Sequence, residues 1–180
     1  PRIIVNYAVL NQHLGKIDKA IKLYNRAIEL YPNQAEVYSN LGGIYRELKR
    51  LEEAELITRK AIKIKNNDTN FHFNLGSILK DLGKLEESEI ELRKAIEIDP
   101  SFTDAYIILG IVLRDIGKLN QAEEISRKSI EISPNCANSY AVLGHVMMGQ
   151  GKTQEAIDCY KKLIEFRPWS IVASQELAYH

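Results

Sequence analysis

The sequence predicts an all-α fold, a solenoid of five helix-turn-helix units of 34 residues followed by a partial sixth helix. A glycine recurs with this period at Gly42, Gly76, Gly110 and Gly144. An unbroken isoleucine series has the same period, at Ile28, Ile62, Ile96, Ile130 and Ile164. We therefore expect one array over the whole chain. Its units are residues 1–34, 35–68, 69–102, 103–136 and 137–170, with the partial helix at 171–180.

The apolar pattern predicts two helices in each unit. In the second unit, apolar and small residues recur at helical spacing over residues 38–48 and again over residues 52–64. A short turn separates the two helices, with Gly83 and Gly117 where a helix end favours a left-handed residue. Proline ends most second helices, and Asn66 takes its place once. We expect about ten helices before the terminal one.

The recurring glycines predict that the two helices of a unit approach closely. A glycine inside a helix costs roughly 0.5–1 kcal/mol relative to alanine, so close packing must offset the loss. Small residues recur on the second helices and offer a complementary surface. They are Ala20, Ala54, Ser88, Ala122 and Ala156, and Ala27, Ala61, Ala95 and Ser129. We expect leucine at Gly110 to overpack this contact.

This pattern resembles the tetratricopeptide repeat family over essentially the whole chain. The second unit carries Tyr38, Leu41-Gly42, Tyr45, Ala54 and Ala61, and the fifth carries Tyr140, Leu143-Gly144, Ala156, Tyr160 and Pro168. The departures are His72, Thr58, Ser126 and Asn66. The resemblance implies a right-handed superhelical solenoid whose first helices line a concave groove. Pentatricopeptide repeats, which bind RNA, look similar but have a period of 35.

Composition narrows the range of partners. The chain has 24 Lys plus Arg and 24 Asp plus Glu, so its formal net charge is zero, which argues against a nucleic-acid partner. The longest apolar stretch, residues 105–113, is far shorter than the roughly 20 residues of a membrane span, so no membrane partner is expected. Two cysteines exclude a disulfide framework, and we expect a cytoplasmic protein. The first residue is Pro1, as in a trimmed chain.

The helical spacing of the residues predicts which face of each first helix lines the groove. Asn6, Asn40 and Asn74 recur there at a single phase. A primary amide both donates and accepts hydrogen bonds, so this ladder suits the backbone of an extended peptide. It looks like the asparagine ladder in the repeats of O-linked N-acetylglucosamine transferases. The alternative is that Asn is merely tolerated on a solvated helix face.

The ladder stops at Ile108 and Val142, where the predicted groove becomes apolar. Ile107, Ile108 and Ile111 lie within about one turn of each other, and an exposed patch of this kind tends to mark an interaction surface. The alternative is that the next repeat partly covers these residues. We expect a groove that captures backbone at its N-terminal end and anchors apolar side chains at its C-terminal end. The other groove candidates are Arg46, Phe73, Lys80, Arg114 and His145.

The sequence shows no arrangement of residues that is typical of a catalytic, metal or chaperone-tail site. In the chaperone-binding members of the family, a carboxylate clamp of Lys, Asn and Arg side chains holds the C-terminal carboxylate of the chaperone. No three consecutive repeats of this sequence supply the required cations. A chaperone C-terminal tail is therefore disfavoured as a partner. The four histidines share no repeat phase, and neither cysteine has ligand spacing with any of them. We therefore expect no metal, no cofactor and no catalysis. Glu55, Glu89 and Glu123 precede Arg59, Arg93 and Arg127 by four residues, which favours helical ion pairs over a phosphate-binding stripe.

Three functional interpretations follow. The first is a scaffold that binds an extended peptide or protein partner in the groove. The second is the substrate-recruiting segment of a larger enzyme resembling a glycosyltransferase or sulfotransferase. The third is self-association, for example as a homodimer, through the patch from Ile107 to Ile111.

Overall fold

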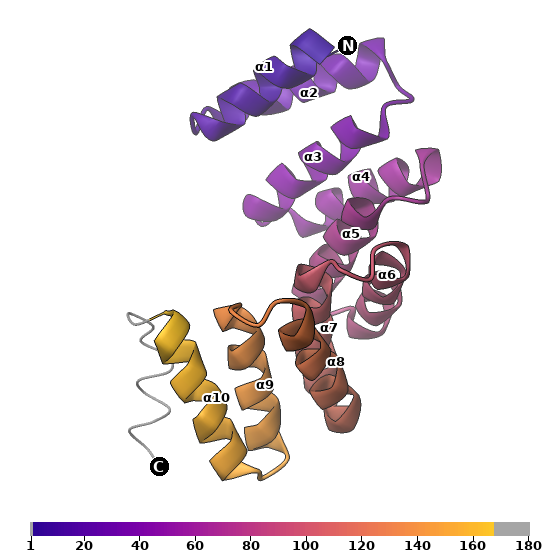
Figure 1. The fold of residues 1–180 in the computed structure, drawn as a ribbon. Helices are drawn as coiled ribbons and strands as arrows, with labels where there is room; N and C mark the ends of the chain where they lie inside the picture. Colours follow the sequence, from indigo (N-terminus) through magenta and orange to yellow (C-terminus); the bar gives the residue numbers. More distant parts are fainter. Residues whose placement is uncertain (1, 168–180) are drawn as a thin grey trace. The chain divides into compact units, whose positions relative to one another are not determined.

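The computed structural model describes residues 2–167, all of whose regular elements are helices (Figure 1). They are α1 (Arg2–His13), α2 (Ile17–Leu30), α3 (Ala35–Glu47), α4 (Leu51–Ile64), α5 (Thr69–Asp81), α6 (Leu85–Ile98), α7 (Thr103–Asp115), α8 (Leu119–Ile132), α9 (Ala137–Gly149) and α10 (Thr153–Phe166). The predicted all-α repeat fold is confirmed. The predicted partial helix at 171–180 and Pro168 lie outside the described residues.

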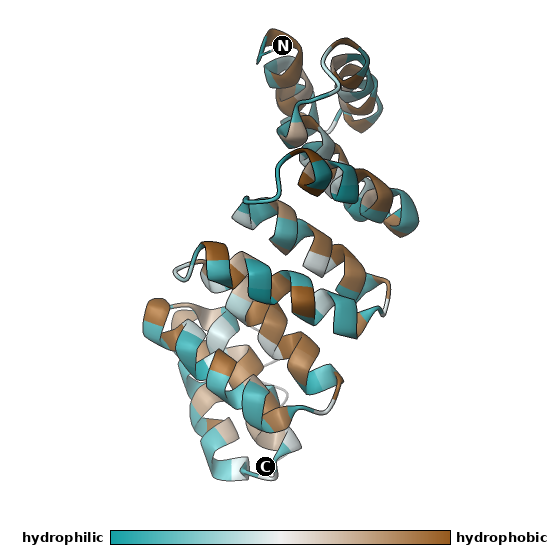
Figure 2. Ribbon diagram, turned by 90° about the vertical axis from the view of Figure 1, so that its right-hand side faces the viewer, coloured by the Kyte–Doolittle hydropathy of each residue, from teal (hydrophilic) through white to brown (hydrophobic). Residues whose placement is uncertain are grey.

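The chain forms two compact units, residues 1–84 and residues 85–180. The first contains α1 to α5, and its best-defined core cluster joins α1, α2 and α3. There Tyr24 of α2, flanked by Ala20 and Ala27, packs with Leu41 and Ile44 of α3. Figure 2 shows hydrophobic and hydrophilic positions interspersed along the helices, as expected of amphipathic helices.

The second compact unit repeats this arrangement with α6 to α10. Helix α7 pairs with α8 and also packs on α6, and α9 pairs with α10 and packs on α8. Leu92, Leu109 and Leu113 are fully buried in this unit. Helices α7 and α9 are therefore each packed against two second helices. This packing fixes the face that each of them leaves open.

Close approach within the helix pairs is confirmed at three glycines. A Cβ atom at Gly42 would collide with Oγ1 of Thr58 and lie 3.2 Å from Cγ2 of Ile57, and one at Gly110 would lie 2.9 Å from Oγ of Ser126. At Gly144 the neighbour is the ring of Tyr160, at 2.6 Å. The residues that face these glycines differ in size, from Ser126 to Tyr160. The small residues of the second helices therefore explain only part of the close approach between paired helices.

A hydrogen bond ties the start of four first helices to the preceding turn. Tyr38 donates from its hydroxyl to the carbonyl of Pro32 (2.9 Å), and Tyr106 and Tyr140 do the same to the residues six positions earlier. His72 and Asn66, which depart from the repeat pattern, replace both members of this pair, and Nε2 of His72 lies 2.7 Å from the carbonyl of Asn66. The two departures therefore preserve one interaction.

The turn between α3 and α4 contains a strained residue. Lys49 has φ of 60°, whereas the equivalent positions in the other repeats are glycines with φ between 70° and 78°. A left-handed conformation costs a residue with a Cβ roughly 1–2 kcal/mol. We expect Lys49→Gly to raise the free energy of unfolding by about 0.5–1 kcal/mol, measured by thermal denaturation. An unchanged or lower melting temperature would contradict this account of the turn.

Candidate functional site

The open face of the first helices in residues 1–84 carries the predicted asparagine ladder. Asn6 on α1 and Asn40 on α3 are exposed, whereas Asn74 on α5 is half-buried. The Asn74 amide donates from Nδ2 to Oγ of buried Ser39 on α3 (3.0 Å), so it also joins two repeats. An amide has two N–H donors and an accepting oxygen, so Asn74 retains hydrogen-bonding capacity beyond this contact.

A pocket of about 360 Å³ lies between α3 and α5 on this face. Two of its lining residues, Arg46 and Asn74, are groove candidates predicted from consecutive repeats. The lining consists of Gly43, Arg46, Glu47, Lys49, Asn74, Ile78 and Asp81. Gly43 contributes to the opening, because a Cβ there would meet no atom within 4 Å. The structure thus brings side chains 34 residues apart in the sequence into one recess.

Charged groups meet at the edge of this pocket. Nε of Arg46 donates to Asp81 on α5 (2.7 Å), and Nζ of Lys80 donates to the other carboxylate oxygen (2.8 Å). Burial raises the pKa of the Asp81 carboxyl, but the hydrogen bonds from Arg46 and Lys80 outweigh burial and hold the pKa below its ordinary value. The carboxylate stays ionised, and it fixes both cations beside the recess. Phe73 on α5 is half-buried.

The expected apolar patch in residues 85–167 is only partly exposed. Ile107 and Val142 are each 6% exposed, so the prediction that they lie open in the groove is wrong. Val142 on α9 packs against α7, where its Cγ1 would lie 3.1 Å from a Cβ at Gly110. Helix α7 therefore covers Val142 at Gly110. Ile108 and Ile111 are half-buried and keep some open surface.

Arg114 and His145 are largely engaged within their own helices. Two nitrogens of the Arg114 guanidinium donate to one oxygen of Asp115, at 3.0 and 2.7 Å. Nδ1 of His145 lies 2.7 Å from the carbonyl of Ala141, and its ring meets that of Tyr160 edge-on. These two side chains offer less to a ligand than the cluster around Asp81.

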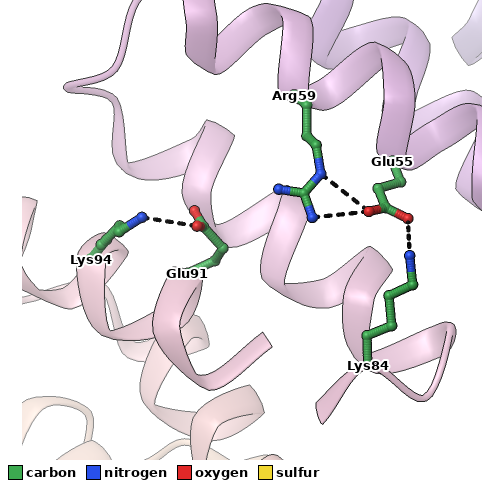
Figure 3. Close-up of polar contacts among 5 residues, drawn as sticks. All are labelled: Glu55, Arg59, Lys84, Glu91 and Lys94. Atoms are coloured by element: carbon green, nitrogen blue, oxygen red, sulfur yellow. Dashed lines mark hydrogen bonds and ion pairs between the residues drawn. The ribbon is translucent and has the colours of Figure 1, made fainter. Parts of the chain in front are cut away.

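Ion pairs on the second helices agree with the predicted spacing and extend it. Glu55 pairs with Arg59 in its own helix (2.9 Å) and also accepts from Lys84 in the turn after α5 (2.8 Å) (Figure 3). Figure 3 also shows the separate pair of Glu91 and Lys94 on α6. The same double bridge recurs in residues 85–167, where Glu89 pairs with Arg93 and Lys118, and Glu123 with Arg127 and Lys152. These cations join neighbouring repeats, which favours the structural interpretation of the basic stripe.

The sequence did not predict a second pocket of about 460 Å³ between α8, α9 and α10. Its lining includes Cys159, which occupies the repeat phase filled by Ile57 and Ile125 in other units. The remaining two units carry Leu23 and Glu91 at this phase, so Cys159 is the smallest side chain there. Burial raises the pKa of the Cys159 thiol to about 11, so the group is a protonated thiol rather than a nucleophile at neutral pH.

Residues 2–167 contain neither a cluster of metal ligands nor a membrane span. No group of three or more His, Cys, Asp or Glu side chains there is placed to hold a metal ion. No helix in the same range has both the length and the apolar character needed to cross a membrane.

Comparisons with known proteins identify the repeat. Sequence profiles of the tetratricopeptide repeat match residues 1–67, 69–102, 103–136 and 137–168. No curated protein sequence gives a significant match. Among solved structures, the MamA protein is similar with a TM-score of 0.81 and 25% identity, over 93% of this chain and 91% of that chain. YrrB, a repeat protein with an unusual peptide-binding site, gives 0.79 and 23%, over 96% and 89%. PilF of Pseudomonas aeruginosa gives 0.85 and 18%, over 96% and 78%.

Proposed function

Because the chain belongs to the tetratricopeptide repeat family, we propose that it is a protein-interaction scaffold that binds an extended peptide along the first helices of residues 1–84. The observation that carries this proposal is the pocket between α3 and α5, which is lined by predicted groove residues from two repeats. A recess with a few convergent polar groups is the usual form of a ligand site.

The polar groups at this face suit a peptide backbone. The exposed Asn40 contacts the Tyr24 hydroxyl, and Asn74 bonds Ser39. Each amide has two donors and an acceptor, so both keep hydrogen-bonding capacity for main-chain N–H and C=O groups. They lie one repeat apart on neighbouring first helices, and a ligand that meets both must extend from α3 to α5. Binding through the backbone gives affinity that depends little on ligand sequence, as in other extended-peptide sites.

The charged cluster adds selectivity to the same face. Arg46 uses Nε to hold Asp81, and its guanidinium carries further N–H donors beside the pocket. A ligand carboxylate or backbone carbonyl would meet these donors without unpairing Asp81. YrrB, which is similar in fold, has a peptide-binding site, and this supports the proposal by analogy only.

The test begins with a display library of random dodecapeptides, from which binders are selected and synthesised. We expect Asn40→Ala combined with Asn74→Ala to weaken most selected peptides by about five- to thirtyfold, because one lost hydrogen bond is worth about 1 kcal/mol. Fluorescence anisotropy measures each Kd.

Circular dichroism of the double variant controls for folding, since Asn74 also bonds Ser39. Asn25→Ala, at an exposed asparagine on the second helix α2, is a matched control. A negligible effect of the double variant on the Kd of every selected peptide would overturn the proposal.

A further inference from the structure

The turn that follows α3 has a lysine where the other repeats have glycine. Lys49 has φ of 60°, and Gly15, Gly83, Gly117 and Gly151 adopt the same left-handed conformation at the equivalent positions. A residue with a Cβ atom is strained in this conformation, so the turn favours glycine. Lys49 therefore occupies a position at which four of the five repeats avoid the strain.

No contact of the Lys49 side chain within the fold offsets this strain. Lys49 is exposed, and its ammonium has no hydrogen-bond or ion-pair partner among residues 2–167. The next residue, Arg50, behaves differently, because its guanidinium donates to Glu53 and lies over the ring of Tyr45. Strained residues of this kind cluster at ligand-binding positions, where the strain holds a side chain in place.

Lys49 lines the pocket between α3 and α5 that carries the proposed peptide site. The Asp81 carboxylate of this pocket already has two cations, because both Arg46 and Lys80 donate to it. The other carboxylate of the lining belongs to Glu47, which is exposed. Arg46 holds Asp81 through Nε, so its remaining N–H groups and the Lys49 ammonium are the cationic donors that a ligand can reach.

We propose that Lys49 is a specificity-determining residue, which selects peptides whose carboxylate binds between its ammonium and the guanidinium of Arg46. This role rests on the proposed function, because Lys49 can select only among peptides that bind along α3 and α5. Charge-assisted hydrogen bonds from two cations to one carboxylate are stronger than bonds between neutral groups. The carboxylate belongs either to an Asp or Glu side chain or to the C-terminus of the peptide.

Parallel selections from the dodecapeptide library test this role, one on the wild-type protein and one on Lys49→Gln. We expect the wild-type binders, but not the binders of the variant, to depend on a carboxylate. Each wild-type binder is synthesised with its acidic residue replaced by the corresponding amide and, separately, with an amidated C-terminus. One of the two changes should raise the Kd about three- to tenfold, measured by fluorescence anisotropy, and it identifies the source of the carboxylate.

Three variants separate the charge of Lys49 from its strain. Lys49→Gly should raise the Kd of the carboxylate-dependent peptides about three- to fivefold, and it should raise the melting temperature by about 1–4 °C. Lys49→Gln keeps the strained backbone, so it should raise the Kd equally and leave the melting temperature unchanged. Lys49→Arg keeps the positive charge and should retain binding. Peptides without the carboxylate should bind alike to all four proteins.

Two further variants control for the net charge of the protein. Lys63→Gln, at an exposed lysine of the second helix α4, should leave every Kd unchanged. Glu47→Gln should tighten the carboxylate-dependent peptides, because Glu47 is the lining carboxylate that repels them. Circular dichroism checks the fold of each variant.

The outcomes distinguish the role of Lys49 from the peptide site itself. Peptides that need Asn40 and Asn74 but bind the wild type and Lys49→Gln with the same Kd would overturn the role of Lys49 and leave the peptide site intact. An empty selection, or peptides that keep their affinity for the Asn40→Ala and Asn74→Ala double variant, would overturn the proposed function, and with it the role of Lys49.

Discussion

Replacing Gly144 with alanine is expected to lower the free energy of unfolding by about 1–3 kcal/mol, although alanine is the better helix former. The added Cβ would lie 2.6 Å from Cε1 of Tyr160 and 3.0 Å from two other ring atoms. Tyr160 is 1% exposed, so its ring cannot swing into solvent to make room. The helices α9 and α10 must therefore move apart. Urea unfolding at 25 °C measures the change.

Gly43 provides the matched control, since it is also a helical glycine. A Cβ there meets nothing within 4 Å, so Gly43→Ala should stabilise the protein by up to about 1 kcal/mol. Gly110→Leu should behave like Gly144→Ala, because it would meet Ser126 and Val142. Two alanine variants that shift stability in the same direction would contradict the close-approach account of the repeat glycines.

Acid is expected to weaken the protein through the bridges between repeats, most clearly at Glu123. The hydrogen bond from Lys152, with a further one from Arg127, lowers the Glu123 pKa from 4.5 to about 2, against the effect of burial. Because the folded-state pKa is depressed, the bridge contributes its full stability above about pH 4.5 and loses it as the pH falls towards 2. Glu55 and Glu89 have pKa values lowered by equivalent partners, although burial opposes the shift.

Glu123→Gln should therefore cost stability near neutral pH and cost progressively less in acid. A shift of this size corresponds to about 3 kcal/mol, but the cations of the bridge are 42% and 49% exposed, so solvent screening reduces the expected loss to about 1–2 kcal/mol. Urea unfolding between pH 7 and pH 3 measures the difference. Glu124→Gln, at an exposed neighbour, should have little effect at any pH. A loss that does not change with pH would contradict the assignment.

The period of 34 residues was sufficient to predict the helices and their pairing. Apolar spacing places each helix, and glycines such as Gly110 identify where a pair touches, since both depend on neighbours within one repeat. The exposure of Ile107 and Val142 was predicted wrongly because it depends on a neighbouring first helix. Packing at Gly110 decides how close that helix lies. The spacing of residues within one helix gives no information on this packing.

The candidate site was predicted in its residues but not in its contacts. Helical phase placed Arg46 and Asn74 on the groove face, and the structure gathers both, with Asp81, around one pocket. The bond from Asn74 to Ser39 and the pairing of Arg46 with Asp81 cross from one repeat to the next. Such contacts depend on the offset between neighbouring helices. The pocket beside Cys159 went unpredicted for a similar reason, because it requires comparing side-chain volume at one phase across repeats.

The most direct test of the proposed peptide site is an NMR titration of the ¹⁵N-labelled protein with a dodecapeptide selected from the library. Binding along α3 and α5 predicts the largest shift changes at the side-chain amides of Asn40 and Asn74 and at the Nε–H of Arg46. Resonances of α10 should barely move. Changes confined to the second helices, with these three groups unaffected, would contradict the account.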